Sequence, residues 1–264
     1  MAKTSLAKQN GFSRSSLYYQ KKLPRRDWAL KIKIEQALHQ EPSYGHKRLA
    51  DHLGVGKYKI LRVMKIFGIK PYRRRGKKPW KKAGKASFSF PNLLMKVFPS
   101  RPNQIWVSDF THLNFKGRVV YLATVMNIFN REIVGFSVML SHGVSLVINA
   151  LFSALNQKPP PEIIHSDQGS EYTSKGYIDL VALFGIETSM SRKASPWENG
   201  YQESFYNQFK VDLGDPSRFE SLGELIYATY QTIHHYNRDR IHTSLKTSPQ
   251  KYLKSYYQSI HKVS

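Results

Sequence analysis

Three runs of mainly apolar residues follow one another in the middle of the chain. They cover residues 105–110, 119–125 and 132–138, and turn-like segments at 114–117 and 127–131 separate them. Runs rich in β-branched and aromatic residues, bounded by Asn and Gly, are typical of strands joined by short turns. The pattern predicts an antiparallel meander of three strands.

A helix and a fourth strand are predicted directly after the meander. Apolar residues recur at helical spacing through residues 145–155, three prolines at 159–161 end that pattern, and residues 163–165 form a short apolar run. This order of elements is that of a ribonuclease-H-like core, an α/β fold with a five-stranded mixed sheet and flanking helices. We assign residues 99–212 to this core and predict a further helix after Pro196.

The N-terminal quarter predicts helices rather than strands. In residues 1–24 two short helical segments flank Gly11, and Ser13 is a good N-cap for the second, which is the pattern of a small helix-turn-helix. Residues 25–72 predict a longer helix-turn-helix with a turn at 54–56. Its predicted core consists of Leu49, Leu53, Ile60, Leu61, Met64 and Phe67. A three-helix unit that touches no bases would give the same pattern, so phosphate contact is the safer expectation.

Two further segments complete the predicted organisation. Residues 73–98 are rich in Lys, Arg, Gly and Pro, which predicts either an extended linker that orders on DNA or a solvated spacer. Residues 213–264 are predicted to be a C-terminal helical extension of the core. The apolar stripe expected to pack on the core consists of Leu225, Ile226, Tyr230 and Ile233.

Positive charge is concentrated in the N-terminal third. Residues 1–98 hold 25 Lys and Arg against 4 Asp and Glu, whereas residues 99–264 hold 16 against 14. A basic surface binds phosphates and releases counterions, so the predicted partner is double-stranded DNA, bound less tightly as salt rises. Membrane-surface binding is the competing explanation, and the lack of an accompanying apolar helix face argues against it.

The sequence holds no cysteine and no long apolar run. Disulfides and thiolate zinc sites are therefore excluded, which fits a reducing cytoplasm. No apolar run reaches the ~18 residues of a membrane span, and the first residues lack a signal-peptide pattern. We expect a cytoplasmic protein without a membrane partner.

Three carboxylates carry the candidate chemistry. Asp109 lies inside the first predicted strand, Asp167 follows the fourth, and Glu203 lies in the helix predicted after Pro196. In-line displacement at a phosphodiester uses two cations roughly 3.5–4 Å apart, and Mg²⁺ prefers oxygen ligands. The three acids are therefore predicted to form a catalytic site for two Mg²⁺ ions, with Mn²⁺ as a substitute.

Two of these acids, Asp167 and Glu203, also have a simpler explanation. The Asp-Gln-Gly sequence at 167–169 is typical of a plain turn. Glu203 would be an ordinary solvated helix acid, and Glu198 competes for its role, although an acid at a helix start simply favours the helix dipole. Helical spacing places four polar residues on one face that suits an approaching phosphate backbone: Asn199, Glu203, Asn207 and Lys210.

Several motifs together resemble a known family. They are WVSDFT at 106–111, NREIVG at 130–135, HSDQGSEYTS at 165–174, SMSRK at 189–193, ESFY at 203–206 and YNRDRIHTSL at 236–245. The chain resembles the retroviral-integrase-like core of bacterial insertion-sequence transposases. It is most similar to the second-reading-frame product of the large two-frame family, whose members move by a copied-out circular DNA intermediate.

The resemblance implies a function for the whole chain. Asp109, Asp167 and Glu203 correspond to the family's metal-binding catalytic acids, and the implied reaction is 3′-end cleavage followed by strand transfer. The resemblance also implies a homo-oligomer on DNA, an upstream-frame product as a possible partner, and a place on the bacterial nucleoid. Two other functions stay open at this point: a catalytically silent DNA-binding regulator and a general nuclease of the same fold.

Basic and polar side chains in the regions described above are the predicted DNA contacts. They are Arg14, Lys47, Arg48, Lys57, Lys59, Arg73, Arg74, Arg75, Lys77, Lys78, Lys81, Lys82, Arg192, Lys193, Asn207, Lys210, Arg240 and His242. Two roles stay open for Arg240 and His242. They either neutralise or orient the scissile DNA strand, or they only stabilise the end of the preceding helix. Tyr236 and Leu245 are expected to pack.

Overall fold

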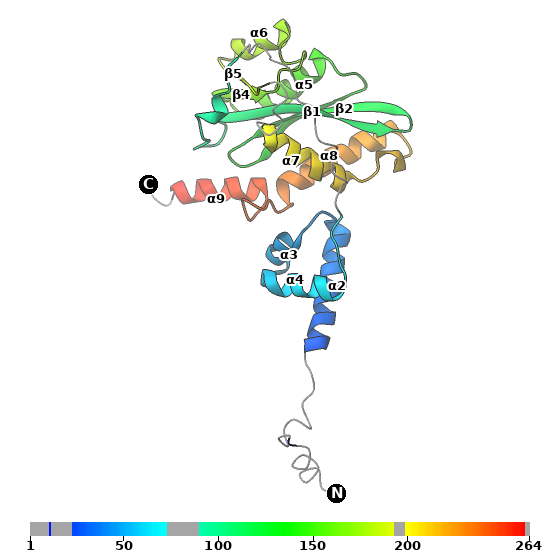
Figure 1. Cartoon of the computed structure of the whole chain (residues 1–264). Coiled ribbons are helices and arrows are strands. Elements are labelled where there is room, and N and C mark those ends of the chain that lie inside the picture. Colours follow the sequence, from blue (N-terminus) through cyan, green and yellow to red (C-terminus); the bar gives the residue numbers. More distant parts are fainter. Residues whose placement is uncertain (1–10, 12–22, 73–89, 193–198, 262–264) are drawn as a thin grey trace. The chain divides into compact units, whose positions relative to one another are not determined.

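The computed structural model describes residue 11 and residues 23–72, 90–192 and 199–261 (Figure 1). The chain divides into two compact units, one ending at Pro71 and one beginning at Tyr72. Each unit has buried apolar residues of its own, so each is described by itself.

The first unit contains three helices, α2 (Leu23–Gln40), α3 (His46–Leu53) and α4 (Lys57–Ile66). Gly54 ends α3 with a φ of 63°, a left-handed conformation that glycine adopts without steric cost. The predicted order of helix, helix, tight turn and helix in this region is confirmed.

The core of the first unit is small and mostly aliphatic. Its buried apolar members include Ile34, Tyr44, Leu49, Ile60 and Val63. Of the six predicted core residues, Leu49, Ile60 and Met64 are buried, whereas Leu53, Leu61 and Phe67 are half-buried. The helical spacing therefore located the packed face, although only half of its predicted members are fully enclosed.

Two predicted segments cannot be compared with the structure. Of residues 1–24, only Gly11, Leu23 and Pro24 are described, so the first predicted helix-turn-helix lies outside the described residues. Residues 73–89 of the predicted linker lie outside them as well.

The second unit is built on a five-stranded mixed sheet. Its strands are β1 (Ile105–Phe115), β2 (Arg118–Asn127), β3 (Glu132–Met139), β4 (Ile163–Ser166) and β5 (Glu187–Met190), in the spatial order β3-β2-β1-β4-β5. The β1–β2 and β2–β3 pairs are antiparallel, and the β1–β4 and β4–β5 pairs are parallel. The predicted meander, fourth strand and ribonuclease-H-like fold class are confirmed.

Helices cover both faces of this sheet (Figure 1). On one face lie α5 (Val144–Leu155) and α6 (Lys175–Leu183), and on the other lie α7 (Gly200–Leu213) and α8 (Leu222–Arg238), which α9 (Pro249–His261) follows. No helix in the described part of the chain is apolar over a stretch long enough to cross a membrane.

Alternation along β1 divides the core between the two faces. Trp106 packs with the residues of α5 and α6, whereas Ile105 and Val107 pack with those of α7 and α8. On the α5 side, a Cβ at Gly135 would lie 2.4 Å from the backbone nitrogen of Ala154. The helix can approach β3 this closely because glycine has no side chain.

Two elements were not located by the sequence pattern, α6 and β5. The sequence of β5 is Glu-Thr-Ser-Met, which shows neither a continuous apolar run nor a clear alternation. Its strand conformation depends on parallel pairing with β4. The four residues of β5 alone do not indicate that pairing, because β4 lies about twenty residues earlier in the sequence.

The chain before residue 99 contributes to the core, which corrects the predicted extent of the linker. The short 3₁₀ helix η2 (Leu93–Met95) donates the Leu93 amide to Ser189 Oγ at 2.9 Å, and the Met190 amide donates to the Pro91 carbonyl at 3.1 Å. Residues 90–97 therefore belong to the sheet's core rather than to the linker.

The C-terminal helices also belong to this core. After the 3₁₀ helix η4 (Pro216–Arg218), α8 buries Leu225 and Ile233 as predicted, but Ile226 and Tyr230 are 41% and 54% exposed. The predicted stripe is therefore wrong for Ile226, whereas the exposed Tyr230 ring still contacts Phe136 of β3, with ring centroids 5.8 Å apart. The buried line of α8 consists of Leu225, Thr229, Ile233, Tyr236 and Asn237.

Candidate active site

Asp109 lies in the middle of β1, on the face that α7 covers. Val107 packs on the α7 side, and alternation along the strand directs Asp109 to the same side. The carboxylate Oδ1 of Asp109 accepts a hydrogen bond from the Phe110 amide at 2.8 Å. The side chain is half-buried, so β1 presents a carboxylate at the boundary between the core and the solvent.

Helix α7 is fixed to β1 by two buried side chains that flank Glu203. Gln202 donates through Nε2 to the carbonyls of Val107 at 2.8 Å and Thr124 at 3.2 Å. Tyr206 donates to the Asp109 carbonyl at 2.6 Å. These contacts join the first turns of α7 to the strand residues around Asp109.

Tyr206 remains a hydrogen-bond donor at neutral pH. Burial, followed by the negative charge of Asp109, raises the pKa of the Tyr206 phenol well above its usual value, and hydrogen bonds with Thr124 only partly oppose this. The protonated phenol can therefore hold the Asp109 backbone throughout the physiological range.

Glu203 is exposed while its neighbours anchor the helix. Phe205 and Phe209 are buried, as predicted, so α7 is amphipathic around the acid. The predicted polar face is only partly solvent-facing: Asn207 is exposed, Lys210 is half-buried and Asn199 is buried. Glu203 therefore stands on a rigid helix with its carboxylate open to a substrate.

Asp167 follows directly from the end of β4. The parallel register pairs Val107 with His165, so Asp109 and Asp167 each lie two residues beyond that pair. Oδ1 of Asp167 accepts the Gly169 amide at 2.9 Å. Asp167 is exposed at the protein surface, and partial loss of water contact around its carboxyl group raises its pKa; the charge of Glu171 adds to this, while the Gly169 hydrogen bond opposes both.

Gly169 leaves room for two carboxylates. A Cβ at this position would lie 3.0 Å from Oδ1 of Asp167 and 3.2 Å from Oε2 of Glu171. Both distances are too short for an ordinary contact, so the absence of a side chain keeps an oxygen-lined space open beside Asp167.

Glu171 and His142 form a pair that the sequence analysis missed. Nδ1 of His142 lies 2.8 Å from Oε1 of Glu171, and the imidazole stacks on Phe110. Burial acts to raise the pKa of Glu171, but hydrogen bonds from His142, from its own backbone amide and from Ser170 lower it overall. The only available signal was the position of Glu171 four residues after Asp167.

The three predicted acids do not form a preformed metal cluster. Within the described ranges, no group of three or more His, Cys, Asp or Glu side chains is arranged to hold a metal ion. Asp109 lies in β1, Asp167 directly follows the neighbouring strand β4, and the helix of Glu203 is anchored beside β1. The donor chemistry is nevertheless that of a hard divalent cation, because every candidate ligand is a carboxylate oxygen.

Comparison with known proteins extends this geometry to a family. The Integrase core domain matches residues 99–196, and a second model of the same description matches residues 184–249. A transposase for insertion sequence element IS904 of Lactococcus lactis is 32% identical over 208 residues, covering 75% of this chain and 79% of that protein. A putative transposase for IS150 of Escherichia coli K12 is 30% identical, covering 88% and 86%.

The chain belongs to the insertion-sequence transposases with an integrase core. Among solved structures, a chain of the simian T-cell lymphotropic virus intasome in complex with PP2A regulatory subunit B56 gamma has a TM-score of 0.52 at 17% identity. The likeness covers 84% of the transposase and 74% of that chain, and it concerns the fold.

The predicted DNA contacts of the transposase divide into three groups. Exposed side chains that can meet DNA are Lys47, Lys57, Lys59, Arg192 and Asn207, and half-buried ones are Lys210 and His242. Outside the described residues lie Arg14, Arg73, Arg74, Arg75, Lys77, Lys78, Lys81, Lys82 and Lys193. Two of the predicted contacts, Arg48 and Arg240, are buried.

Arg48 and Arg240 are therefore corrected. The guanidinium of Arg48 lies over the Tyr44 ring at 5.8 Å, inside the first unit. Arg240 is 1% exposed, and its Nε donates to Oδ2 of Asp212 at 2.7 Å. This ion pair joins the segment after α8 to the end of α7. Arg240 therefore has the structural role considered above, not that of a DNA contact.

Arg240→Ala is expected to destabilise the second unit. Removing one partner of a buried ion pair leaves the other charge without compensation, which costs about 3–5 kcal/mol. The melting temperature followed by circular dichroism should fall by roughly ten degrees. Asp212→Ala should give a similar fall, and the double variant should lose less than the sum. A melting temperature unchanged by Arg240→Ala would contradict this assignment.

Asp167→Asn is expected to stabilise the metal-free protein slightly. A folded-state pKa above the ordinary value means that folding disfavours the charged carboxylate, and this penalty is full at high pH and disappears as pH falls through the folded pKa. Asparagine keeps the acceptor for the Gly169 amide without the charge. The melting temperature should rise slightly at neutral and higher pH, and this rise should disappear as pH falls through the folded-state pKa of Asp167.

A matched control for Asp167→Asn is available on α6. Asp179→Asn removes one exposed carboxylate that pairs with Lys175 at 2.7 Å, so it should bring no stabilisation. A fall in melting temperature for Asp167→Asn would show that the carboxylate is favoured in the folded state.

Proposed function

We propose that this transposase frees a 3′-hydroxyl at the end of an insertion sequence and joins it to another phosphodiester, through a copied-out circular intermediate. The main support for this proposal is the attachment of α7 to β1, in which Gln202 and Tyr206 fix the helix of Glu203 beside Asp109. Asp167 follows the neighbouring strand β4. All three acids lie within the segments that match integrase cores.

Asp109, Asp167 and Glu203 are the residues proposed to hold Mg²⁺, as two ions, with Mn²⁺ as a substitute. When bound, the ions would activate the attacking hydroxyl or water and stabilise the leaving oxygen. The space beside Gly169 and the purely carboxylate donor set fit such ions. The raised pKa of Asp167 fits them too, because a nearby cation would offset the cost of its charge.

The protein's own residues would position the DNA. Exposed Glu203 and Asn207 lie one turn apart on α7, so a strand that reaches the acid also meets a neutral polar side chain. Lys57 and Lys59 at the start of α4 offer exposed charges for phosphate contacts. These contacts would hold a DNA end while the acids act on one phosphodiester.

The proposed partners are double-stranded element ends and target DNA, with several copies of the transposase assembled on them. Resemblance to two-frame elements supports an upstream-frame product as a further partner. Relatives from bacteria support action on the nucleoid in the cytoplasm. A gel shift with this chain alone, compared with the chain plus the upstream-frame product, tests whether that product is needed for end binding.

Two other functions stay as alternatives, a silent DNA-binding regulator and a general nuclease. Loss of any of the three acids would favour the regulator, and all three are present. A strand-transfer assay on supercoiled plasmid, with a labelled element end and Mg²⁺ or Mn²⁺, separates the functions. Labelled joined product supports the transposase, binding without cutting supports the regulator, and cutting without joining supports a general nuclease.

A further inference from the structure

A cavity of about 390 Å³ lies beside α7, on the side of the helix next to Glu203. It opens between the end of β2, the turn before β3, α7 and the segment that follows α8. Its polar lining residues are Arg131, Tyr201, Ser204, Gln208, His242 and Ser244. Among the described residues that line it there are several hydrogen-bond donors and neither Asp nor Glu.

Arg131 is the main cation of this cavity. Its guanidinium lies 4.1 Å from the centre of the Tyr201 ring, which holds it in place by a cation–π contact. In the described part of the chain, Nη1 of Arg131 is buried and has no hydrogen-bond partner. A buried charged donor without an acceptor is costly, so the site favours an anion.

His242 also lines the cavity, from the segment that follows α8. The Ser244 amide donates to Nδ1 of His242 at 3.3 Å. An imidazole that accepts at Nδ1 carries its proton at Nε2. The cavity thus combines a guanidinium with an imidazole. Together with the hydroxyls of Ser204 and Ser244 and the side-chain amide of Gln208, these groups suit the binding of a phosphate.

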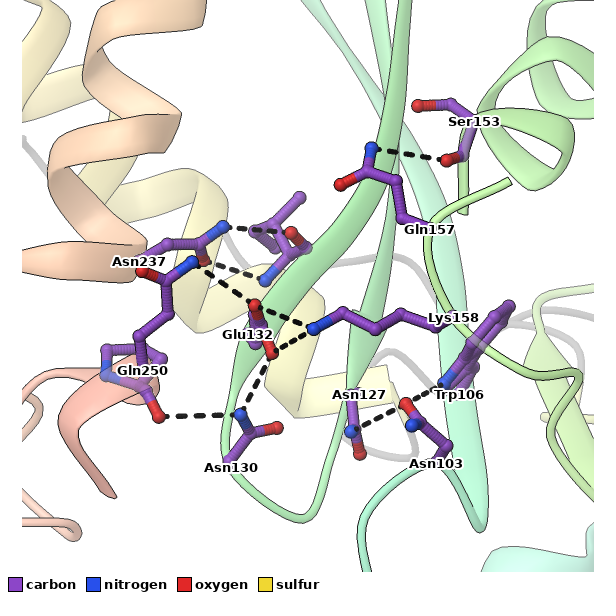
Figure 2. Close-up of polar contacts among 12 residues, drawn as sticks. Asn103, Trp106, Asn127, Asn130, Glu132, Ser153, Gln157, Lys158, Asn237 and Gln250 are labelled. Atoms are coloured by element: carbon purple, nitrogen blue, oxygen red, sulfur yellow. Dashed lines mark hydrogen bonds and ion pairs between the residues drawn. The ribbon is translucent and has the colours of Figure 1, made fainter. Parts of the chain in front are cut away.

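The turn that carries Arg131 is held rigidly. Arg131 has a φ of 64°, a conformation that disfavours a residue with a Cβ. The next residue, Glu132, is buried among polar partners: Lys158 Nζ at 3.3 Å, Asn130 Nδ2 at 3.1 Å and Gln250 Nε2 at 3.3 Å (Figure 2). This network ties the turn to α9 and to the segment after α5, which fixes the backbone on which Arg131 is carried.

The cavity also lies where a DNA strand would pass. Gly200, Ser204 and Gln208 line it at intervals of four residues along α7. Glu203 and Asn207 form the neighbouring row, rotated by one residue around the helix. A strand whose phosphodiester reaches Glu203 would therefore have an adjacent phosphate within the range of the cavity.

We propose that this cavity binds one phosphate of a DNA strand, next to the phosphodiester at Glu203, through Arg131 and His242. The proposal rests on the proposed function, since it assumes that the strand approaches Glu203. Arg131, and not Arg240, is then the arginine that contacts the DNA strand, since Arg240 is buried against Asp212.

Phosphate-by-phosphate interference tests the proposal in the full chain. Each phosphate around the cleavage point of a short duplex carrying the element end is replaced in turn by a neutral methylphosphonate, and equilibrium binding is measured. Wild type should lose roughly tenfold in affinity at one position on one side of the cleavage point. Arg131→Asn should bind unmodified DNA roughly tenfold more weakly and should be insensitive to that same replacement.

The matched control is Lys116→Asn. Lys116 also has a positive φ, 43°, and is exposed in the β1–β2 hairpin, at the opposite end of β2 from Arg131. Asparagine tolerates this backbone region at both positions, so each variant loses one positive charge without added strain. Lys116→Asn should keep the wild-type interference profile. His242→Ala, which removes the lining imidazole, should weaken the effect of the same phosphate.

Identical interference profiles for wild type and Arg131→Asn would overturn the proposal. It would also be overturned if inorganic phosphate at constant ionic strength raised the melting temperature of wild type alone while no DNA phosphate showed interference, because the cavity would then bind a free anion. Binding needs no cleavage, so a chain that shows the interference but cuts no DNA would keep this inference and refute the proposed function.

Discussion

We expect Asp109→Asn and Glu203→Gln each to abolish DNA cleavage and joining, by roughly a thousandfold or more, while DNA affinity stays close to that of wild type. The amide keeps the shape of the side chain but loses the charge that holds a divalent cation. The anchors of α7 do not involve either carboxylate, because Gln202 and Tyr206 bind backbone carbonyls of Val107, Thr124 and Asp109. The helix should therefore keep its place in both variants.

Three measurements make this prediction specific. Strand transfer with a labelled element end reports activity, a gel shift reports DNA binding, and the rise in melting temperature on adding Mn²⁺ reports cation binding. Asp167→Asn should behave as the other two acid variants do. Glu198→Gln, which changes the competing acid, and Asp179→Asn on α6 should retain activity. Substantial strand transfer by any of the three acid variants would remove that residue from the proposed site.

Local patterns were sufficient where an element is defined by its own residues. The runs rich in β-branched and aromatic residues at 105–110 and 119–125 suit a strand in any context, and both lie inside strands, although β1 extends to Phe115, into the segment predicted as a turn. The same holds for α3 and α4, whose boundary is set by Gly54. Local patterns also placed Asp109 inside one strand and Asp167 directly after another, whereas the pairing that makes these two strands neighbours is long-range.

Long-range packing decided what the sequence could not. Arg240 sits in a polar motif that suits DNA binding, yet Asp212, 28 residues earlier, encloses it in an ion pair. Ile226 and Tyr230 are spaced one helical turn apart, but the buried line of α8 runs through Leu225, Thr229 and Ile233, so Ile226 is exposed and Tyr230 contacts Phe136 of β3 only from the edge of that line. The cavity at Arg131 needs residues from β2, α7 and the segment after α8, and no sequence window contains all three.

The second large effect is expected from removing residues 1–89. These residues hold 24 of the 41 Lys and Arg but only 4 of the 18 Asp and Glu, so the remaining chain carries a net charge of about +3 instead of +23. DNA affinity at low salt should fall by roughly a hundredfold or more, because phosphate neutralisation supplies most non-specific affinity. The cut lies before Phe90, since residues 90–97 pack on the sheet and their loss would confuse binding with folding.

The salt dependence separates phosphate contact from other losses. Each phosphate contact contributes a slope of about −0.9 to the plot of log affinity against log salt, so the truncated protein should show a much flatter line. Within the full chain, Lys57→Gln with Lys59→Gln removes two exposed charges of α4 and should flatten the slope by roughly two units if both touch phosphates. The double variant should weaken binding equally on specific and unrelated DNA, because phosphate contacts carry no sequence information. A truncated protein that binds DNA as tightly as the full chain, with an unchanged slope, would place the DNA-binding surface on the integrase core instead.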